Sequence, residues 1–237
     1  MPVPVGRVPR MPRRILALVP VLLALVFTGA CDGGSGGPAK KADFDAAQTL
    51  RQAAQAMGSL KSVAFTLESD GKTPVMVKGG DMKLLRGGDA EGTLAVEQQG
   101  QKVEMKVVAV GDSIYLDAGT GGWRKLPKGL AASVYDPSAV LDPQRGIAKL
   151  LTSAREPSPE AVEKVDGKEA YRVAAKLPKE EVAGLIPGIG EDMDGQVWVG
   201  KADHRLLKVR GAFPKDQGSV TIRFTEFDAP YKISAPR

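Results

Sequence analysis

Apolar side chains alternate with polar ones along most of the chain after Lys61, and this period of two constrains the fold more than any other feature. Successive side chains of a strand point to opposite faces, so each alternating segment has one apolar face. Turn signals such as Asp70-Gly71 and Asp166-Gly167 separate the segments. The pattern predicts a large antiparallel meander. The apolar positions that share a face within a segment are Val63, Phe65 and Leu67; Val103, Met105 and Val107; Ile114 and Leu116; Tyr171, Val173 and Ala175; Val197 and Val199; Leu207 and Val209; and Val220, Ile222 and Phe224.

The residues before the first of these segments follow a helical period instead. The stretch FDAAQTLRQAAQAM, residues Phe44 to Met57, is rich in helix formers, and Gly58 follows it. It predicts an N-terminal amphipathic helix. Two later stretches, Leu130–Ala154 and Lys179–Ile189, interrupt the meander and predict short helical pieces with an apolar side.

A sheet with one apolar face must bury that face, and the short helices are the available cover. The predicted fold is therefore α+β: a large curved antiparallel sheet whose concave apolar face is covered by the N-terminal helix and the short pieces. Many residues of these pieces are small, such as Ala131, Ala139 and Ala183. Thin cover leaves two alternatives open, an apolar cavity under the helices or a fully packed core.

Composition excludes several classes of protein. The single cysteine, Cys31, excludes an internal disulfide and a multi-cysteine zinc site. The chain has 33 Lys+Arg against 28 Asp+Glu, but four arginines and no acid fall within residues 1–30. Subtracting them leaves 29 against 28, so the remainder is almost neutral. With no basic patch interleaved with aromatic residues, we expect no nucleic-acid partner.

The N-terminus has the order of an export signal. Residues 1–14 are rich in Arg and Pro, Ile15–Phe27 is an uncharged apolar run, and small residues follow it. The run is shorter than a membrane-spanning helix requires. Residues 1–30 are therefore predicted to be a signal peptide; Met1 and Met11 both remain open as its start, and the export route is open as well.

FTGAC resembles a bacterial lipobox, in which the cysteine is lipid-modified and becomes the mature N-terminus. We therefore predict cleavage before Cys31, lipidation of Cys31, and a lipid-anchored, extracytoplasmic protein. The alternative is an ordinary secretory signal in which Cys31 has no role. Residues 31–43 contain DGGSGG and are predicted to be a flexible Gly/Ser tether, and residues 44–237 a single domain.

The order of features after the lipobox resembles the mycobacterial LppX/LprA/LprF/LprG lipoprotein family, within the wider LolA/LolB-like group. The resemblance covers residues 44–237 and rests on the spacing of LKSVAFTLES, KVDGKEAYRV, LPKEEVAGLIPG, DGQVWVGKADHRLLKVRG and GSVTIRFTEFDAPYKISAP. It implies a half-barrel sheet wrapped on helices, with an apolar cavity for acylated lipids. It thus implies a carrier or presenter of acylated lipids or glycolipids outside the cytoplasmic membrane, for which a membrane transporter is a candidate partner.

The family has no short catalytic motif, so candidate residues come from the alternation itself. The residues expected to line a cavity are Phe65, Leu67, Met105, Val107, Tyr171, Val173, Ile222 and Phe224. The residues expected to form a gate over it are Val140, Leu141, Ile147, Leu150, Val182, Leu185 and Ile186.

Signals for catalysis or metal binding are weak. His204 is the only histidine and falls in a turn between two predicted strands. GEDMDG lacks the glutamate that would complete a calcium loop, since Lys201 stands there. We therefore expect no enzyme activity, no metal and no cofactor. The alternative to a lipid carrier is a tethered envelope sensor or adaptor that binds a membrane protein, with a packed core and an exposed patch.

Overall fold

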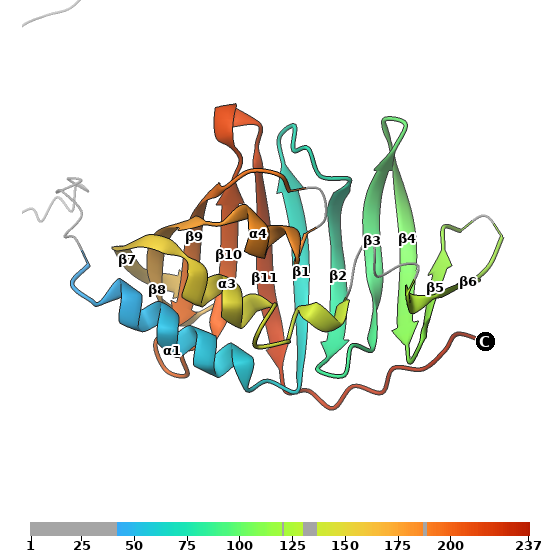
Figure 1. The fold of residues 1–237 in the computed structure, drawn as a ribbon, viewed down its shortest axis with the longest axis horizontal. Helices are drawn as coiled ribbons and strands as arrows, with labels where there is room; N and C mark the ends of the chain where they lie inside the picture. The colour runs from blue at the N-terminus through green and yellow to red at the C-terminus, as the bar shows by residue number, and fades with distance from the viewer. Residues whose placement is uncertain (1–41, 120, 130–136, 187–188) are drawn as a thin grey trace, which may run out of the picture. The chain divides into compact units, whose positions relative to one another are not determined.

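Eleven antiparallel strands form one sheet in the computed structural model, which describes residues 42–119, 121–129, 137–186 and 189–237 (Figure 1). All of these residues belong to one unit, Lys40–Arg237. The strands are β1 (Ser62–Asp70), β2 (Val77–Leu85), β3 (Ala90–Gln98), β4 (Gln101–Val110), β5 (Ser113–Asp117), β6 (Arg124–Pro127), β7 (Arg155–Val165), β8 (Lys168–Leu177), β9 (Met193–Gly200), β10 (Leu206–Ala212) and β11 (Ser219–Phe227).

The strand order explains how the chain covers its own sheet. The order is β6-β5-β4-β3-β2-β1-β11-β10-β9-β8-β7, so β1 and β11 meet in the middle and β6 and β7 form the two edges. The chain runs outward from β1 to β6, passes to the opposite edge, and returns inward from β7 to β11. The connection from β6 to β7 must therefore span the sheet, and it carries the 3₁₀ turn η1 (Pro137–Ala139) and helix α3 (Ile147–Ser153).

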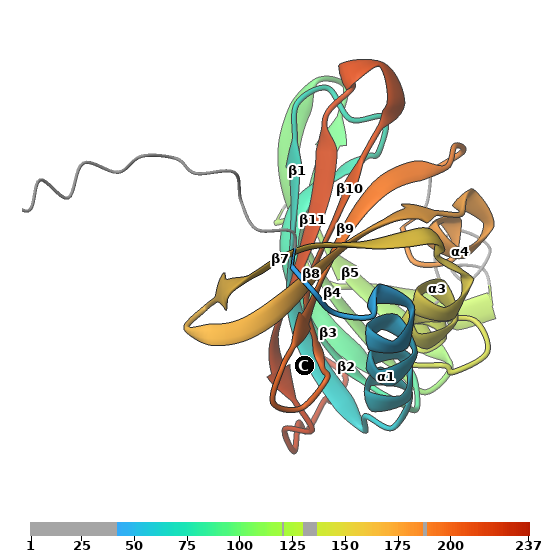
Figure 2. The ribbon, with the colours of Figure 1, turned by 90° about the vertical axis from the view of Figure 1, so that its left-hand side faces the viewer.

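Helices α1 (Ala46–Gly58), α3 and α4 (Lys179–Ala183) lie on the same side of the curved sheet (Figure 2). The predicted α+β class, with an N-terminal helix and short helices on one face of a large antiparallel sheet, is confirmed. None of the helices in the described part of the chain is long and apolar enough to cross a membrane. A further 3₁₀ turn, η2 (Pro214–Asp216), joins β10 to β11.

Helix α1 begins two residues after the predicted start because Asp45 caps it. The Asp45 carboxylate accepts a 2.8 Å hydrogen bond from the backbone N–H of Gln48, which satisfies a free donor of the first turn. Phe44 is left outside the helix, and its ring packs against the ring of Tyr171 at 4.6 Å between centroids. One face of the helix is buried against the sheet and α3, as its apolar spacing predicts.

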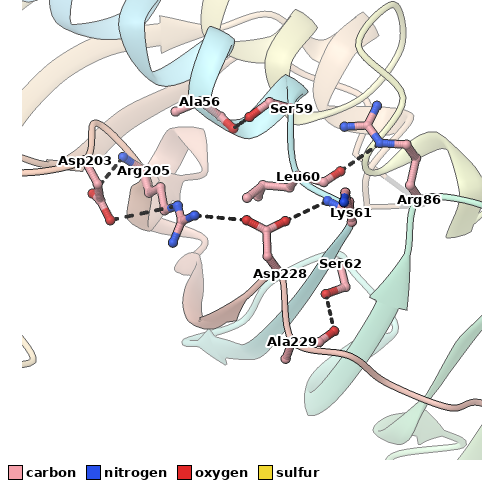
Figure 3. Close-up of polar contacts among 10 residues, drawn as sticks. All are labelled: Ala56, Ser59, Leu60, Lys61, Ser62, Arg86, Asp203, Arg205, Asp228 and Ala229. Atoms are coloured by element: carbon pink, nitrogen blue, oxygen red, sulfur yellow. Dashed lines mark hydrogen bonds and ion pairs between the residues drawn. The ribbon is translucent and has the colours of Figure 1, made fainter.

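The junction between α1 and β1 is held by polar contacts from the far end of the chain (Figure 3). One carboxylate oxygen of Asp228 accepts a 2.8 Å hydrogen bond from the backbone N–H of Lys61, and the other pairs with Arg205 at 2.9 Å. Ser62 Oγ donates to the carbonyl of Ala229 at 2.6 Å. Arg86 donates to the carbonyl of Leu60 at 2.8 Å. The bonds of Asp228 and Ser62 tie the end of β11 to the start of β1, and the bond of Arg86 adds the segment that follows β2.

Two apolar clusters on the helical side and one on the opposite face account for the buried core. The large cluster joins α1, the turn after η1 and α3 to the sheet, and the second lies around α4. On the opposite face, Trp198 and Leu207 pack with Val165 and Ala170. The prediction that Leu207 shares a face with Val209 is wrong. A bulge between Leu206 and Lys208 inserts one residue into β10 and shifts Leu207 to the Trp198 side.

Candidate functional site

A small apolar pocket lies between the sheet and the helices α3 and α4. Its volume is about 40 Å³. Residues of β8 to β11 line it from below, and residues of the two helices and the segment after α4 line it from above. The lining residues are Ile147, Leu150, Leu177, Val182, Leu185, Ile186, Met193, Leu206, Val209, Gly211, Val220, Ile222 and Phe224.

The floor of the pocket follows from strand alternation and from one glycine. Val220, Ile222 and Phe224 are alternate residues of β11 and therefore share its inner face. On the neighbouring strand, Gly211 has no side chain, and a Cβ built there would come within 2.9 Å of Met193 Cε. The absence of that Cβ lets the long thioether of Met193 lie across the backbone of β10.

The roof is made of two short helices with apolar residues at helical spacing. Ile147 and Leu150 lie three apart on α3, and Val182 and Ile186 lie four apart on α4 and the turn after it. Helix α4 starts after Pro178. The negative charges of Glu180 and Glu181 in its first turn interact favourably with the partial positive charge at the N-terminal end of the helix. A helix of this length depends on packing for its stability.

Polar bonds connect the parts of the roof. Ser153 Oγ, at the end of α3, donates a 3.1 Å hydrogen bond to Glu181 Oε1 on α4. At the start of α4, the backbone N–H of Lys179 donates to Asp192 Oδ1 at 2.9 Å, and Asp192 also pairs with Arg155 at 3.7 Å. The last pair is exposed and contributes little. Opening the roof at α4 therefore has to break a small number of weak polar bonds as well as apolar contacts.

The chemistry of the pocket is that of hydrocarbon recognition. Its described lining residues are all apolar, so no side chain there can transfer a proton or attack a substrate. Burial of an apolar ligand surface would contribute about 25 cal/mol per Å². A cavity of about 40 Å³ holds space for roughly three water-sized spheres. A long acyl chain must therefore displace the roof, or move flexible side chains such as Met193.

The residues predicted from the sequence fall into two groups. Ile222 and Phe224 line the pocket from the sheet, and five residues of the expected gate line it from above: Ile147, Leu150, Val182, Leu185 and Ile186. The rest lie elsewhere on the helical side of the sheet. Phe65, Val107, Val173, Val140 and Leu141 are buried in the large cluster, Met105 packs against its edge, Leu67 is in the cluster around α4, and Tyr171 contacts Phe44.

Further residues of the alternating segments also line the pocket. Val209 and Val220 belong to segments whose inner faces were identified, and both line the pocket. Leu177 and Met193 stand at the facing ends of β8 and β9, where they are paired in register. Cys31, residues 31–41 of the predicted tether and residues 130–136 of the predicted Leu130–Ala154 stretch lie outside the described residues.

Other candidate chemical groups have structural explanations. His204 lies in the turn between β9 and β10 with a φ of 55°, and its backbone N–H bonds to the carbonyl of Gly200 at 3.0 Å. Ser69 Oγ donates to the carbonyl of Val77 at 3.0 Å. Over the part of the chain that the structure describes, no three His, Cys, Asp or Glu side chains gather to hold a metal ion.

Comparison with known sequences identifies related proteins over nearly the whole domain. The sequence model of the LppX_LprAFG lipoprotein family matches residues 45–233. A lipoarabinomannan carrier protein LprG of Mycolicibacterium hassiacum is 30% identical over 198 residues, which are 81% of this chain and 84% of that protein. A putative lipoprotein LprA of Mycobacterium tuberculosis is 26% identical over 241 residues, 95% of this chain and 98% of that protein.

Comparison with solved structures shows the same fold. LprF of Mycobacterium bovis superposes with a TM-score of 0.72 at 19% identity, over 81% of this chain and 96% of that one. The Mycobacterium tuberculosis lipoprotein LppX superposes with a TM-score of 0.62 at 18% identity, over 79% of this chain and 97% of that one. At these identities the likeness shows the fold alone.

Proposed function

This chain belongs to the LppX/LprA/LprF/LprG lipoprotein family, and from that premise we propose that it carries or presents acylated lipids or glycolipids in the pocket beneath α3 and α4. The related LprG proteins are named lipoarabinomannan carriers, which supports a glycolipid as the ligand class. The family resemblance inferred from the sequence motifs is thereby confirmed, whereas the ligand of this chain is part of the proposal.

The observation that carries the proposal is an apolar pocket that is covered by two short helices. An all-apolar lining selects hydrocarbon and excludes acid–base catalysis by a side chain at that position. Above it stand a helix of 5 residues and a helix of 7 residues, joined by the bond between Ser153 and Glu181. Short elements with few polar contacts open at low free-energy cost. They suit a site that must admit and release a chain.

The mechanism we propose is differential burial. An acyl chain leaves the membrane when the roof opens, and it gains apolar contacts as the roof closes over it. Release reverses the same step and requires no chemical change in either molecule. The expected gate residues Val140 and Leu141 lie beside the roof in the large cluster, where they would move with α3.

Lipidation at Cys31 would keep the carrier at the membrane surface. A diacylglyceryl group holds a protein to a bilayer firmly, since each buried CH₂ contributes about 0.8 kcal/mol. The predicted tether would span roughly 20 Å as a random coil. The domain could then reach lipids of its own membrane, and a membrane transporter remains the proposed partner for delivery.

A transfer assay tests the proposed function. Vesicles that contain a pyrene-labelled phosphatidylglycerol are mixed with unlabelled vesicles, and the loss of excimer fluorescence reports transfer. We expect the purified protein to accelerate transfer in proportion to its concentration. A protein that binds a membrane partner through a surface patch and has no lipid site would leave the rate unchanged, and that result would favour the sensor or adaptor instead.

A further inference from the structure

A second hollow lies at the end of the sheet where β1 passes into β2 and β3 turns into β4. It is an open groove with a volume of about 520 Å³, which is within the range of ligand-binding clefts. Unlike the pocket beneath α3 and α4, it has a mixed polar and apolar lining. The residues that line it are Ser69, Gly71, Lys72, Thr73, Pro74, Val75, Met76, Lys78, Glu97, Gln99, Gly100 and Lys102.

The charges around the groove do not balance. Lys78 Nζ pairs with Glu97 at 3.1 Å and also donates to the carbonyl of Thr73 at 2.9 Å, so this lysine is neutralised and holds the β1–β2 loop. Lys72 and Lys102 are exposed, and no hydrogen bond or ion pair joins the side chain of either one to another described residue, although Lys102 stands opposite Glu97 in the β3–β4 pairing. Glu97 is the sole acid among the described lining residues. The groove therefore offers two uncommitted cations to an anionic ligand.

One side chain connects this groove to the apolar pocket. Val75 lines the groove, is only 2% exposed, and packs in the same cluster as Val182 and Ile186 of the roof. The next residue, Met76, is 64% exposed at the rim. A polar group in the groove would thus contact Val75, and a hydrocarbon beneath α4 would contact Val182 and Ile186 of the same apolar cluster. This arrangement matches the two ends of an amphiphile.

We infer that the groove binds the phosphate-bearing head group of an anionic lipid whose acyl chain occupies the pocket beneath α4. The inference rests on the proposed function, because the chain must be bound for the head group to be placed. Lys72 and Lys102 supply the opposite charge, Thr73 and Ser69 lie at the inner wall, and Met76 covers the glycerol region. Exposed lysines suit a phosphate as point charges that do not require a fixed geometry.

Two probes with the same chain separate this inference from the proposed function. Oleoyl-lysophosphatidylglycerol and mono-oleoylglycerol share one oleoyl chain, and only the first bears a phosphate. Their affinities for the full-length protein are measured by competition with a fluorescent fatty acid, below their micelle-forming concentrations. We expect the anionic probe to bind about three- to tenfold more tightly at low salt, with the difference lost at high salt because of screening.

The double variant Lys72→Gln, Lys102→Gln should remove that preference and leave the affinity for mono-oleoylglycerol unchanged. The matched control is Lys106→Gln, Lys164→Gln, which removes two exposed lysines from β4 and β7 and should keep the preference. Equal binding of both probes by the native protein, or a preference that survives in the first variant, would overturn the head-group site. Failure of both probes to bind would instead overturn the proposed function.

Free phosphate is the other source of the same anion. In an amide-resolved NMR titration, inorganic phosphate alone should move the signals of the β1–β2 loop only at concentrations far above those of the lysolipid. If phosphate binds as tightly as the lysolipid, the groove is a site for the free anion and the lipid head-group inference is wrong.

Discussion

Met193 lies across the backbone of Gly211, where a Cβ would come within 2.9 Å of the Met193 Cε and 3.0 Å of its sulfur. Both residues line the pocket beneath α3 and α4. The pocket is therefore bounded on this side by a flexible side chain that rests on a bare backbone. Because methionine has three rotatable bonds, it can retreat when a ligand enters. Its freedom to do so depends on Gly211.

Gly211→Ala should reduce the amount of lipid bound while the protein remains folded. The added Cβ pushes the flexible end of Met193 into the cavity, and overpacking of this kind typically costs about 1–3 kcal/mol. We expect less lipid per protein after loading with oleoyl-lysophosphatidylglycerol, measured by mass spectrometry of the extract. Gly87→Ala is the control, since a Cβ there meets nothing within 4 Å. Equal loading of the two variants would contradict the described position of Met193.

Ser153→Ala should speed lipid exchange by freeing α4 from α3. The change removes the hydrogen bond to Glu181, which contributes about 0.5–1.5 kcal/mol, so exchange should accelerate by roughly two- to tenfold. Stopped-flow release of a fluorescent fatty acid measures the rate. Thr152→Ala is the matched control, because the Thr152 hydroxyl bonds only to carbonyls of its own helix. The same acceleration in both variants would show that the bond between Ser153 and Glu181 does not hold the roof.

The C-terminal segment should loosen as the pH rises above 10. Burial and a hydrogen bond to Glu226 raise the pKa of Tyr231 from its ordinary value of 10.0 to about 12. The folded protein therefore holds this proton more tightly than the unfolded chain does. The resulting stabilisation is complete below pH 10 and is lost between pH 10 and pH 12.

The measurement is a pH titration of the phenolate absorbance, compared between the native protein and Tyr231→Phe. The native protein should show a tyrosine ionisation with a pKa of about 12, and the variant should lack it. Its stability should also depend less on pH in this range. A Tyr231 whose pKa lies at its ordinary value of 10.0 would mean that residues 228–237 are not packed against β2 and β11 as the contacts with Lys83 and Glu226 indicate.

Cys31→Ser should prevent lipid attachment to the protein. If Cys31 is the lipidated residue, the variant cannot be acylated, and labelled palmitate supplied to the cells will not be incorporated. We expect the native protein in the detergent-soluble membrane fraction and the variant in its uncleaved form or outside that fraction. Palmitate that stays attached to the Cys31→Ser protein would contradict the predicted anchor. Thr28→Leu, which brings FTGAC nearer to the usual lipobox, should leave lipidation intact.

Alternation predicted the strands with a regular apolar–polar pattern. It missed strands such as β2 and β7, in which glycines, prolines or a register shift interrupt that pattern. Strand β7 contains Pro157 and Pro159, and proline interrupts the hydrogen bonds of a sheet. It is tolerated because β7 is an edge strand with a partner on one side only. In β2 the pair Gly79-Gly80 resembles a turn, and a register shift between Val77 and Gly79 hides the alternation. Edge position and bulges depend on tertiary pairing, so the local pattern did not reveal them.

The sequence left a cavity and a packed core both open, and only some of its candidate lining residues lie at the pocket. Alternation identifies the inner face of a regular strand such as β11, which carries Ile222 and Phe224, but not that of the bulged strand β10. It does not say which strands the helices cover. Met105 and Val107 lie on β4, in the half of the sheet on the other side of β1 from β11, whereas the pocket lies over β8 to β11. Which strands the helices cover depends on how the chain returns from β7 across the sheet. That return is set by the strand order, which the periodicity of the sequence does not reveal.

Native mass spectrometry of the full-length protein, purified from its own host in a mild detergent, tests the central claim most directly. The account predicts a population that is heavier by one acylated lipid than the same sample in denaturing solvent, where only covalently attached lipid remains. It also predicts that the lipid-bound population is smaller in Gly211→Ala than in the native protein, and that it is not reduced in Gly87→Ala. Identical native and denatured masses, with no uptake after incubation with oleoyl-lysophosphatidylglycerol, would contradict a lipid carrier.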